Sequence, residues 1–94
     1  MEELHALATP IRDAVRRHRG TGKVMVFGSV ARGDADDDSD VDLLVEFLPE
    51  ATLFDLAALE LTLADLLGRP VDVMSLHSQG RALEHAIRQA IPLP

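Results

Sequence analysis

The sequence contains no cysteine, tryptophan or tyrosine, and its 94 residues include only three phenylalanines. Without cysteine the chain can form neither a disulfide nor a thiolate metal site, which indicates a reducing environment. With so few aromatic rings it offers few platforms on which bases could stack. These absences argue against a disulfide scaffold and against a protein that binds single-stranded nucleic acid.

Basic side chains are also scarce, because nine lysines and arginines stand against sixteen aspartates and glutamates, a net charge of -7. Affinity for nucleic acid depends largely on Lys and Arg at phosphates, so a polynucleotide is not the expected substrate. No apolar run approaches the roughly 18 residues of a membrane span. The acidic start Met1-Glu2-Glu3 does not resemble a signal peptide. We expect a cytoplasmic protein that contacts neither membrane nor nucleic acid directly.

The length and composition fit one folded domain over residues 1–94, with 47% apolar and 27% charged side chains. A chain this short has room for one core and none for a separate substrate domain. Because that core is small, we expect modest stability that a partner protein can increase.

The first predicted element is an amphipathic helix, since apolar residues recur at helical spacing from Leu4 to Val15. Proline is harmless only at the start of a helix, so the preferred N-cap is Thr9 with Pro10 next. Residues 20–22, with two glycines, are expected to end the helix. Four arginines fall mostly off the apolar stripe and are expected on the solvated surface: Arg12, Arg16, Arg17 and Arg19.

Three apolar segments predict strands. Residues 24–27 are continuously apolar, as in a sheet interior covered on both faces, and turn at Gly28-Ser29 into a short helix. A polar loop over 34–39 leads to the second strand, Val41 to Phe47. The third strand, residues 71–74, carries an acid in its middle.

Two further helices follow from apolar stripes. The stripe from Leu53 to Leu67 predicts a helix with Thr52 or Asp55 as N-cap and Gly68 at its end. We expect this stripe mostly in the core, with some of it available to a partner. A last helix is expected over 78–91, capped by the serine at its start. Three strands with helices packed over them predict a two-layer α/β or α+β domain.

Two acids, Asp40 and Asp42, open the second predicted strand. Residues two apart in a strand point the same way, so their carboxylates repel and a divalent cation relieves that repulsion. Hard oxygen ligands of this kind suit Mg²⁺, which shares its remaining sites with phosphates. Asp72 completes the set if its strand lies beside that of Asp42; otherwise it is an acid on an exposed edge.

The turn between the first strand and the short helix is a candidate phosphate site. Gly28 lets a ligand approach the backbone, and Ser29 can present its hydroxyl and amide at the start of the helix. Arg32 lies about one helical turn further on. It can contact phosphate or pair with a nearby aspartate, and the sequence leaves both interpretations open.

Other metal and phosphate motifs fit less well. The spacing of Gly28 and Gly33 begins a P-loop, but Asp34-Ala35 stands where Lys and Ser or Thr must follow. As a calcium loop, the segment has Ser39 at the turn glycine and Val45 at the final glutamate. The loop acids are therefore expected to be solvated: Asp34, Asp36, Asp37 and Asp38. The histidines lack ligand spacing, which argues against zinc: His5, His18, His77 and His85.

Gly28-Ser29, ten residues, and Asp40-Val41-Asp42 together resemble the signature of the DNA polymerase β-like nucleotidyltransferase superfamily. The fuller strings at 27–34 and 39–45 resemble the minimal nucleotidyltransferases of prokaryotes. The resemblance implies an α/β (α+β) fold with a small three-stranded mixed sheet. It also implies that Asp40, Asp42 and Asp72 bind two Mg²⁺ ions. Ser29 would hold the triphosphate of ATP, and Asp72 would help to deprotonate the acceptor.

Proteins of this kind are typically encoded beside a HEPN ribonuclease toxin and act as its antitoxin. The resemblance implies transfer of AMP from ATP to a tyrosine near the toxin's active site. Because this chain has no tyrosine, the acceptor must lie on another chain. One alternative is an antitoxin that neutralises its partner by binding and occlusion alone. Another is nucleotidyl transfer to a small molecule such as an aminoglycoside, although the chain has no added domain to hold one.

Overall fold

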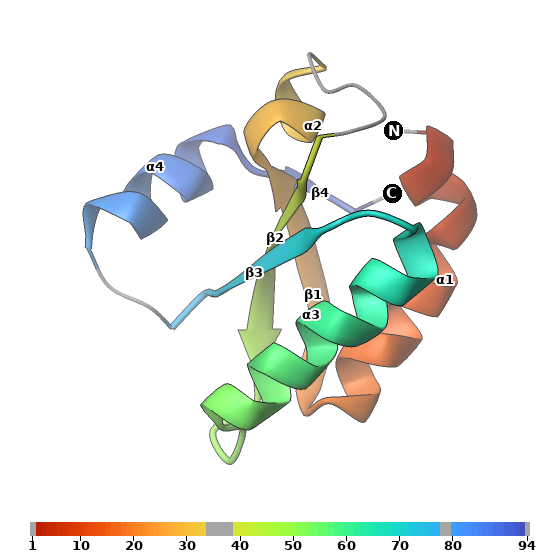
Figure 1. Ribbon diagram of the computed structural model, residues 1–94. Helices are drawn as coiled ribbons and strands as arrows, with labels where there is room; N and C mark the ends of the chain where they lie inside the picture. Colours follow the sequence, from red (N-terminus) through yellow and green to blue (C-terminus); the bar gives the residue numbers. More distant parts are fainter. Residues whose placement is uncertain (1, 34–38, 78–79, 94) are drawn as a thin grey trace.

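The computed structural model describes residues 2–33, 39–77 and 80–93, with eight elements along the chain. Figure 1 shows their arrangement around a central sheet. The predicted strand at 41–47 and the predicted helix at 53–67 have the bounds expected from the sequence. The elements are α1 (Glu2–Arg17), β1 (Gly20–Phe27), α2 (Gly28–Arg32), β2 (Val41–Phe47), α3 (Leu53–Leu67), β3 (Val71–Ser75), α4 (Arg81–Gln89) and β4 (Ile91–Pro92).

The sheet is mixed, with strand order β3-β2-β1-β4. β1 pairs antiparallel with β2 and with β4, whereas β2 pairs parallel with β3. The predicted class, an α/β (α+β) fold with a mixed sheet, is confirmed. β1 and β2 are the interior strands, which explains why their sequences are apolar on both faces.

The sheet has four strands and not the expected three, because the last helix stops at Gln89 and is followed by β4. Pro92 disfavours helical geometry at the residue before it, and Ala90 is already extended. The N–H of Leu93 then donates to the carbonyl oxygen of Val24 at 3.1 Å, and the Leu93 side chain is buried. The serine expected to cap the last helix lies outside the described residues; the N-cap in the structure is Gly80.

Helices cover both faces of the sheet: α1 and α3 lie on one side and α4 on the other (Figure 1). Alternate side chains of a strand point to opposite faces, so β2 contributes to both layers. Leu44 packs in a small cluster with Leu83 and Ala86 of α4. The other face of β2 contributes to the main core, as the period-two pattern predicts: Val41, Leu43, Val45 and Phe47.

The expected start of the first helix was wrong. α1 begins at Glu2 and passes through Pro10. A proline inside a helix costs roughly 3 kcal/mol, but Leu4 and Ala8 are both buried in the main core. Burial of a leucine side chain alone contributes about 2 kcal/mol. Packing of the first two turns therefore offsets much of the cost, and Pro10 itself is exposed.

The helix ends at Arg17, and Gly20 begins β1 instead of ending α1. A Cβ atom at Gly20 would meet the Val15 side chain and approach the Val15 carbonyl oxygen to 2.9 Å. Only glycine allows the strand to pass this close to the helix. Arg19, in the turn between them, adopts a left-handed conformation with φ of 65°.

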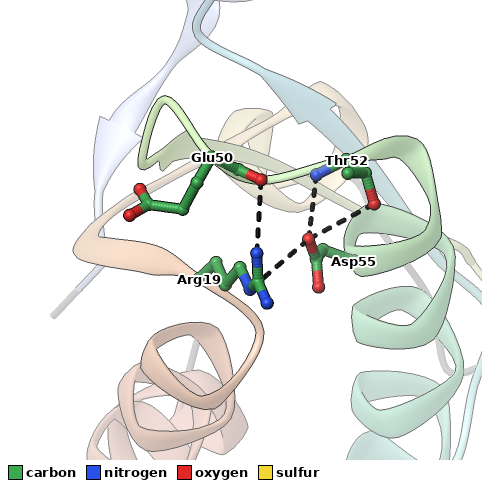
Figure 2. Close-up of polar contacts among 4 residues, drawn as sticks. All are labelled: Arg19, Glu50, Thr52 and Asp55. Carbon is green, nitrogen blue, oxygen red and sulfur yellow. Dashed lines mark hydrogen bonds and ion pairs between the residues drawn. The ribbon is translucent and has the colours of Figure 1, made fainter.

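The arginine at that turn joins two parts of the chain. Arg19 donates to the carbonyl oxygen of Glu50 at 3.4 Å and lies 4.0 Å from the carboxylate of Asp55 (Figure 2). Asp55 also accepts the N–H of Thr52 at 2.8 Å, so both candidate caps take part in starting α3. Arg19 and Arg12 were both expected to be solvated, but each contacts another part of the chain. The Nη2 of Arg12 donates to the carbonyl oxygen of Leu93 at 2.8 Å.

The long apolar stripe of α3 is divided between core and surface. Leu59, Leu63 and Leu67 are buried, whereas Leu53 and Leu66 are exposed. The expectation that most of the stripe packs inward is confirmed for one side of the helix only. Within residues 2–33, 39–77 and 80–93, no helix combines the length and the hydropathy that a bilayer crossing requires.

Candidate active site

Asp42 and Asp72 lie side by side at one end of the sheet. β2 and β3 are adjacent parallel strands, and these two acids are paired in the register. Two residues further along the strands, Leu44 and Met74 both belong to the cluster packed against α4. Because side chains alternate along a strand, both carboxylates point to that same side. Asp72 was expected to join the site only if its strand lay beside that of Asp42, and this condition is confirmed.

The pKa of Asp42 is raised above its ordinary value, first by burial and then by the negative charges of Asp72 and Asp40. The charge of Arg32 acts in the opposite direction. Asp42 is half-buried, whereas Asp40 and Asp72 are exposed. The three acids therefore act on one another electrostatically, and a bound cation would relieve the repulsion.

Gly28 lies directly against the carboxylate of Asp42. A Cβ at this position would meet that carboxylate and approach its Cγ to 3.1 Å, and Gly28 has a φ of 71°. Both the close approach and the backbone conformation require glycine. Ser29 follows, half-buried in the first turn of α2. The structure thus brings the predicted phosphate-binding turn next to the predicted metal-binding carboxylate.

Arg32, the last residue of α2, connects this turn to α4. Its Nη1 donates to Oε1 of Gln89 at 3.2 Å. Its charge also reaches Asp42, whose pKa it lowers. Sequence reasoning did not select Gln89, because nothing in a polar residue near the end of a helix indicates a contact 57 positions away. The structure shows Arg32 in a scaffold contact, and its proposed contact with phosphate stays a prediction.

The carboxylates do not form a complete ligand cage. Across the part of the chain that the structure describes, no group of three His, Cys, Asp or Glu side chains is close enough together to hold a metal ion. Asp40 precedes β2 and is exposed. Carboxylate oxygens are nevertheless the ligands that Mg²⁺ prefers, so the donor chemistry fits. The loop acids Asp34, Asp36, Asp37 and Asp38 lie outside the described residues.

With this geometry established, similarity to known proteins identifies the family. A family model described as a nucleotidyltransferase domain matches residues 9–91. The chain belongs to this nucleotidyltransferase family. The resemblance carried by Gly28-Ser29 and the Asp40-Val41-Asp42 segment is confirmed, and the chain is a nucleotidyltransferase.

Individual relatives agree with this assignment. The protein adenylyltransferase MntA of Thermococcus cleftensis is 39% identical over 74 residues, which cover 79% of this chain and 75% of the relative. A solved structure assigned as a minimal nucleotidyltransferase is 46% identical and has a TM-score of 0.82. The match covers 98% of this chain and 94% of that chain.

More distant structures share the fold. A toxin–antitoxin structure with AMP-PNP has a TM-score of 0.78 at 24% identity, over 92% of this chain and 71% of that chain. A Shewanella oneidensis complex of a tri-AMPylated HEPN toxin with an MNT antitoxin has a TM-score of 0.72 at 20% identity, over 96% of this chain and 71% of that chain. At these identities the likeness shows the fold alone.

Proposed function

We propose that this nucleotidyltransferase transfers AMP from ATP to a tyrosine of a HEPN-domain toxin and thereby silences the toxin. The observation that carries the proposal is the in-register pair Asp42 and Asp72, with Gly28 packed against Asp42. The relative from T. cleftensis is named a protein adenylyltransferase. Structures of the same fold are toxin–antitoxin complexes, one with AMP-PNP and one with an AMPylated HEPN toxin. These support the choice of nucleotide and partner.

The three acids would share two Mg²⁺ ions with the phosphates of ATP, which would supply the ligands that the carboxylates alone do not, and Gly28 and Ser29 would accommodate the triphosphate. When bound, the metal ions would supply charge neutralisation on the phosphates and in-line alignment. Arg32 would add a further positive charge beside the phosphates. These assignments extend the family's pattern to Asp40, Asp42 and Asp72 at the end of the sheet where β2 and β3 begin.

In the transfer itself, the acceptor oxygen forms a bond to the α-phosphorus of ATP. The bond from that phosphorus to the bridging oxygen breaks, and pyrophosphate leaves. The acceptor's proton goes to a base, for which Asp72 is the candidate because it is exposed beside Asp42. Asp42, half-buried and with a raised pKa, must be ionised to serve as a ligand, and a bound cation would favour that ionised form.

Neutralisation by binding alone is the second candidate function. It is favoured by the exposed apolar side chains of α3, of which Leu53 is 82% and Phe54 is 87% exposed. Such residues are typical of a protein interface. Binding and catalysis are compatible, so the test must separate them.

The test is the intact mass of the HEPN-domain protein encoded beside this chain, measured after incubation with the chain, ATP and Mg²⁺. We expect the mass to increase by one or more adenylyl groups with wild type and to stay unchanged with Asp42→Asn. The matched control is Glu46→Gln, which alters an acid on the same strand and face at the far end of β2. Equal transfer by wild type and Asp42→Asn would overturn the proposal. Inhibition of the toxin without any mass change would favour occlusion.

A further inference from the structure

The outer side of α3 carries four exposed apolar residues, which we call the α3 stripe: Leu53, Phe54, Ala57 and Leu61. Their spacing places them together on the side of the helix that faces away from the core. The three large side chains are 82%, 87% and 74% exposed. Single exposed apolar residues are ordinary on a protein surface, but a contiguous row of large ones marks an interaction site.

A groove extends the α3 stripe toward the end of the sheet. It has a volume of about 480 Å³ and lies between the start of α3 and the final residues of β2 and β3. Leu53 belongs to both the stripe and the groove, so the two surfaces are continuous. Apolar side chains form most of the wall, among them Phe47, Leu48, Pro49 and Leu56.

Polar contacts fix the shape of this surface. Asp55 accepts the N–H of Thr52, and Arg19 lies beside the same carboxylate. These contacts connect the start of α3 to the turn before β1 (Figure 2). On the other wall, the Nε2 of His77 is 3.1 Å from the carbonyl oxygen of Phe47. A surface that is already ordered loses little conformational entropy when a partner binds.

The charges of α3 indicate what kind of surface covers the stripe. The helix contains Asp55, Glu60 and Asp65 and no basic residue. Asp55 lies beside Arg19, and Glu60 accepts the N–H of Val73, so Asp65 is the exposed acid among the three. Because the whole chain carries a net charge of -7, it would repel a second copy of itself and an anionic lipid surface. Strand addition at the neighbouring edge of β3 is also blocked at Val73, whose N–H donates to Oε2 of Glu60 at 2.8 Å. The complementary surface is apolar and rimmed by lysine or arginine.

We propose that the α3 stripe and its groove are the docking site for the partner protein. The partner would contribute an apolar helical surface that is rimmed by basic residues. This inference rests on the proposed function, because the partner it names is the HEPN-domain toxin. A ribonuclease holds RNA phosphates with lysines and arginines, so such a toxin can supply the basic rim.

The docking surface and the carboxylates lie at opposite ends of β2. Asp42 is near the start of the strand, and Phe47, which lines the groove, is its last residue. Five residues of extended chain span roughly 17 Å. The partner is therefore held at one end of the sheet while its acceptor segment reaches the other. Loss of docking will weaken binding of the partner and leave the chemistry of bound partner intact.

The test replaces the exposed side chains in the triple variant Leu53→Gln, Phe54→Gln and Leu61→Gln. Its control is Ile87→Gln, an apolar residue on α4 that is 48% exposed and lies on the other side of the sheet. The Kd for the HEPN-domain protein is measured by calorimetry in an Asp42→Asn background, so that no AMP is transferred. We expect the triple variant to bind at least ~30-fold more weakly, the loss typical of an interface hot spot. We expect Ile87→Gln to bind within about twofold of the unsubstituted protein.

Two results would overturn the docking proposal. One is an unchanged Kd in the triple variant. The other is a wild-type dimer, seen by light scattering, that the triple substitution dissociates while partner affinity is retained, because the stripe would then join two copies of this chain. Failure of the proposed function would look different: wild type would bind the partner through the stripe but would not increase its mass in the presence of ATP and Mg²⁺.

Discussion

The two ends of the sheet differ in how their side chains are placed. At the end where β2 and β3 begin, Asp42 is half-buried, paired in register with Asp72 and in contact with Gly28. At the other end, Leu53 and Phe54 are almost fully exposed. Under our two proposals, the first end is catalytic and depends on the position of a few atoms, whereas the second end docks the partner and depends on apolar area. Substitutions at the first should therefore change turnover, and substitutions at the second should change affinity.

The largest effect is expected from Asp42→Asn. Removing the carboxylate should lower the rate of AMP transfer by on the order of 10³-fold or more, as loss of a central electrostatic group does. Partner affinity should stay unchanged, because Asp42 is far from the α3 stripe. Calorimetry and the mass assay measure the two quantities on one sample. A loss of affinity equal to the loss of rate would show that the two ends are not independent.

Gly28→Ala should follow, with a decrease in rate of about 100-fold, because a displacement of about 1 Å at a reacting group has that effect. The new Cβ would push against the carboxylate of Asp42, and the φ of 71° adds roughly 1–2 kcal/mol of strain. The control is Gly68→Ala, where φ is 70° and a new Cβ would approach no other described segment of the chain within 4 Å. Both variants should lose stability in urea denaturation because of the positive φ, Gly28→Ala by at least as much as Gly68→Ala, but only Gly28→Ala should lose activity.

The dependence of stability on pH tests the electrostatics of the site. The pKa of Asp42 is raised in the folded state, so its contribution to stability is fully present below the unfolded pKa and is lost as pH rises through the folded pKa. The free energy of unfolding of wild type relative to Asp42→Asn should therefore fall as pH increases through and just above the usual range for aspartate. Millimolar Mg²⁺ at neutral pH should raise the Tm of wild type more than that of the variant. A difference that is constant with pH would contradict the raised pKa.

The smallest effects are expected at Arg32, and they separate its two roles. Arg32→Gln should raise the KM for ATP about tenfold, the effect of losing a charge-assisted hydrogen bond to phosphate. Gln89→Ala removes only the 3.2 Å scaffold contact and should change KM by less than about threefold, as an exposed contact does. Equal effects of the two substitutions would show that Arg32 acts only as scaffold.

Local patterns predicted which residues meet at the proposed catalytic end. The period-two alternation of β2 predicted that Asp42 and Leu44 share one face of the strand, and the structure places that face against α4. The spacing of Gly28-Ser29 and Asp42 selected residues that the structure brings together, and their roles with metal and phosphate stay predictions. Proximity of Asp72 could only be stated as a condition, because strand order depends on contacts between distant segments. The contact between Gln89 and Arg32 could not be predicted for the same reason, because it also joins distant segments.

The docking end and the termini were harder to predict. A helix that is apolar nearly all round gives no periodicity by which to separate Leu59 in the core from Leu53 at the surface. The start of α1 was misplaced because the cost of Pro10 was visible in the sequence, whereas the burial of Leu4 and Ala8 was not. β4 was missed because two residues become a strand only through pairing with β1.

The most direct test of the separation between catalysis and docking is the rate of AMP transfer, followed by intact mass, as a function of HEPN-domain protein concentration. Wild type, Asp42→Asn and the triple variant of the α3 stripe would be compared at saturating ATP and Mg²⁺. We predict that Asp42→Asn stays inactive at every partner concentration, whereas the triple variant approaches the wild-type rate when the partner is in large excess. A triple variant whose maximal rate stays as low as that of Asp42→Asn, or an Asp42→Asn variant that transfers AMP, would contradict a catalytic end and a docking end that act independently.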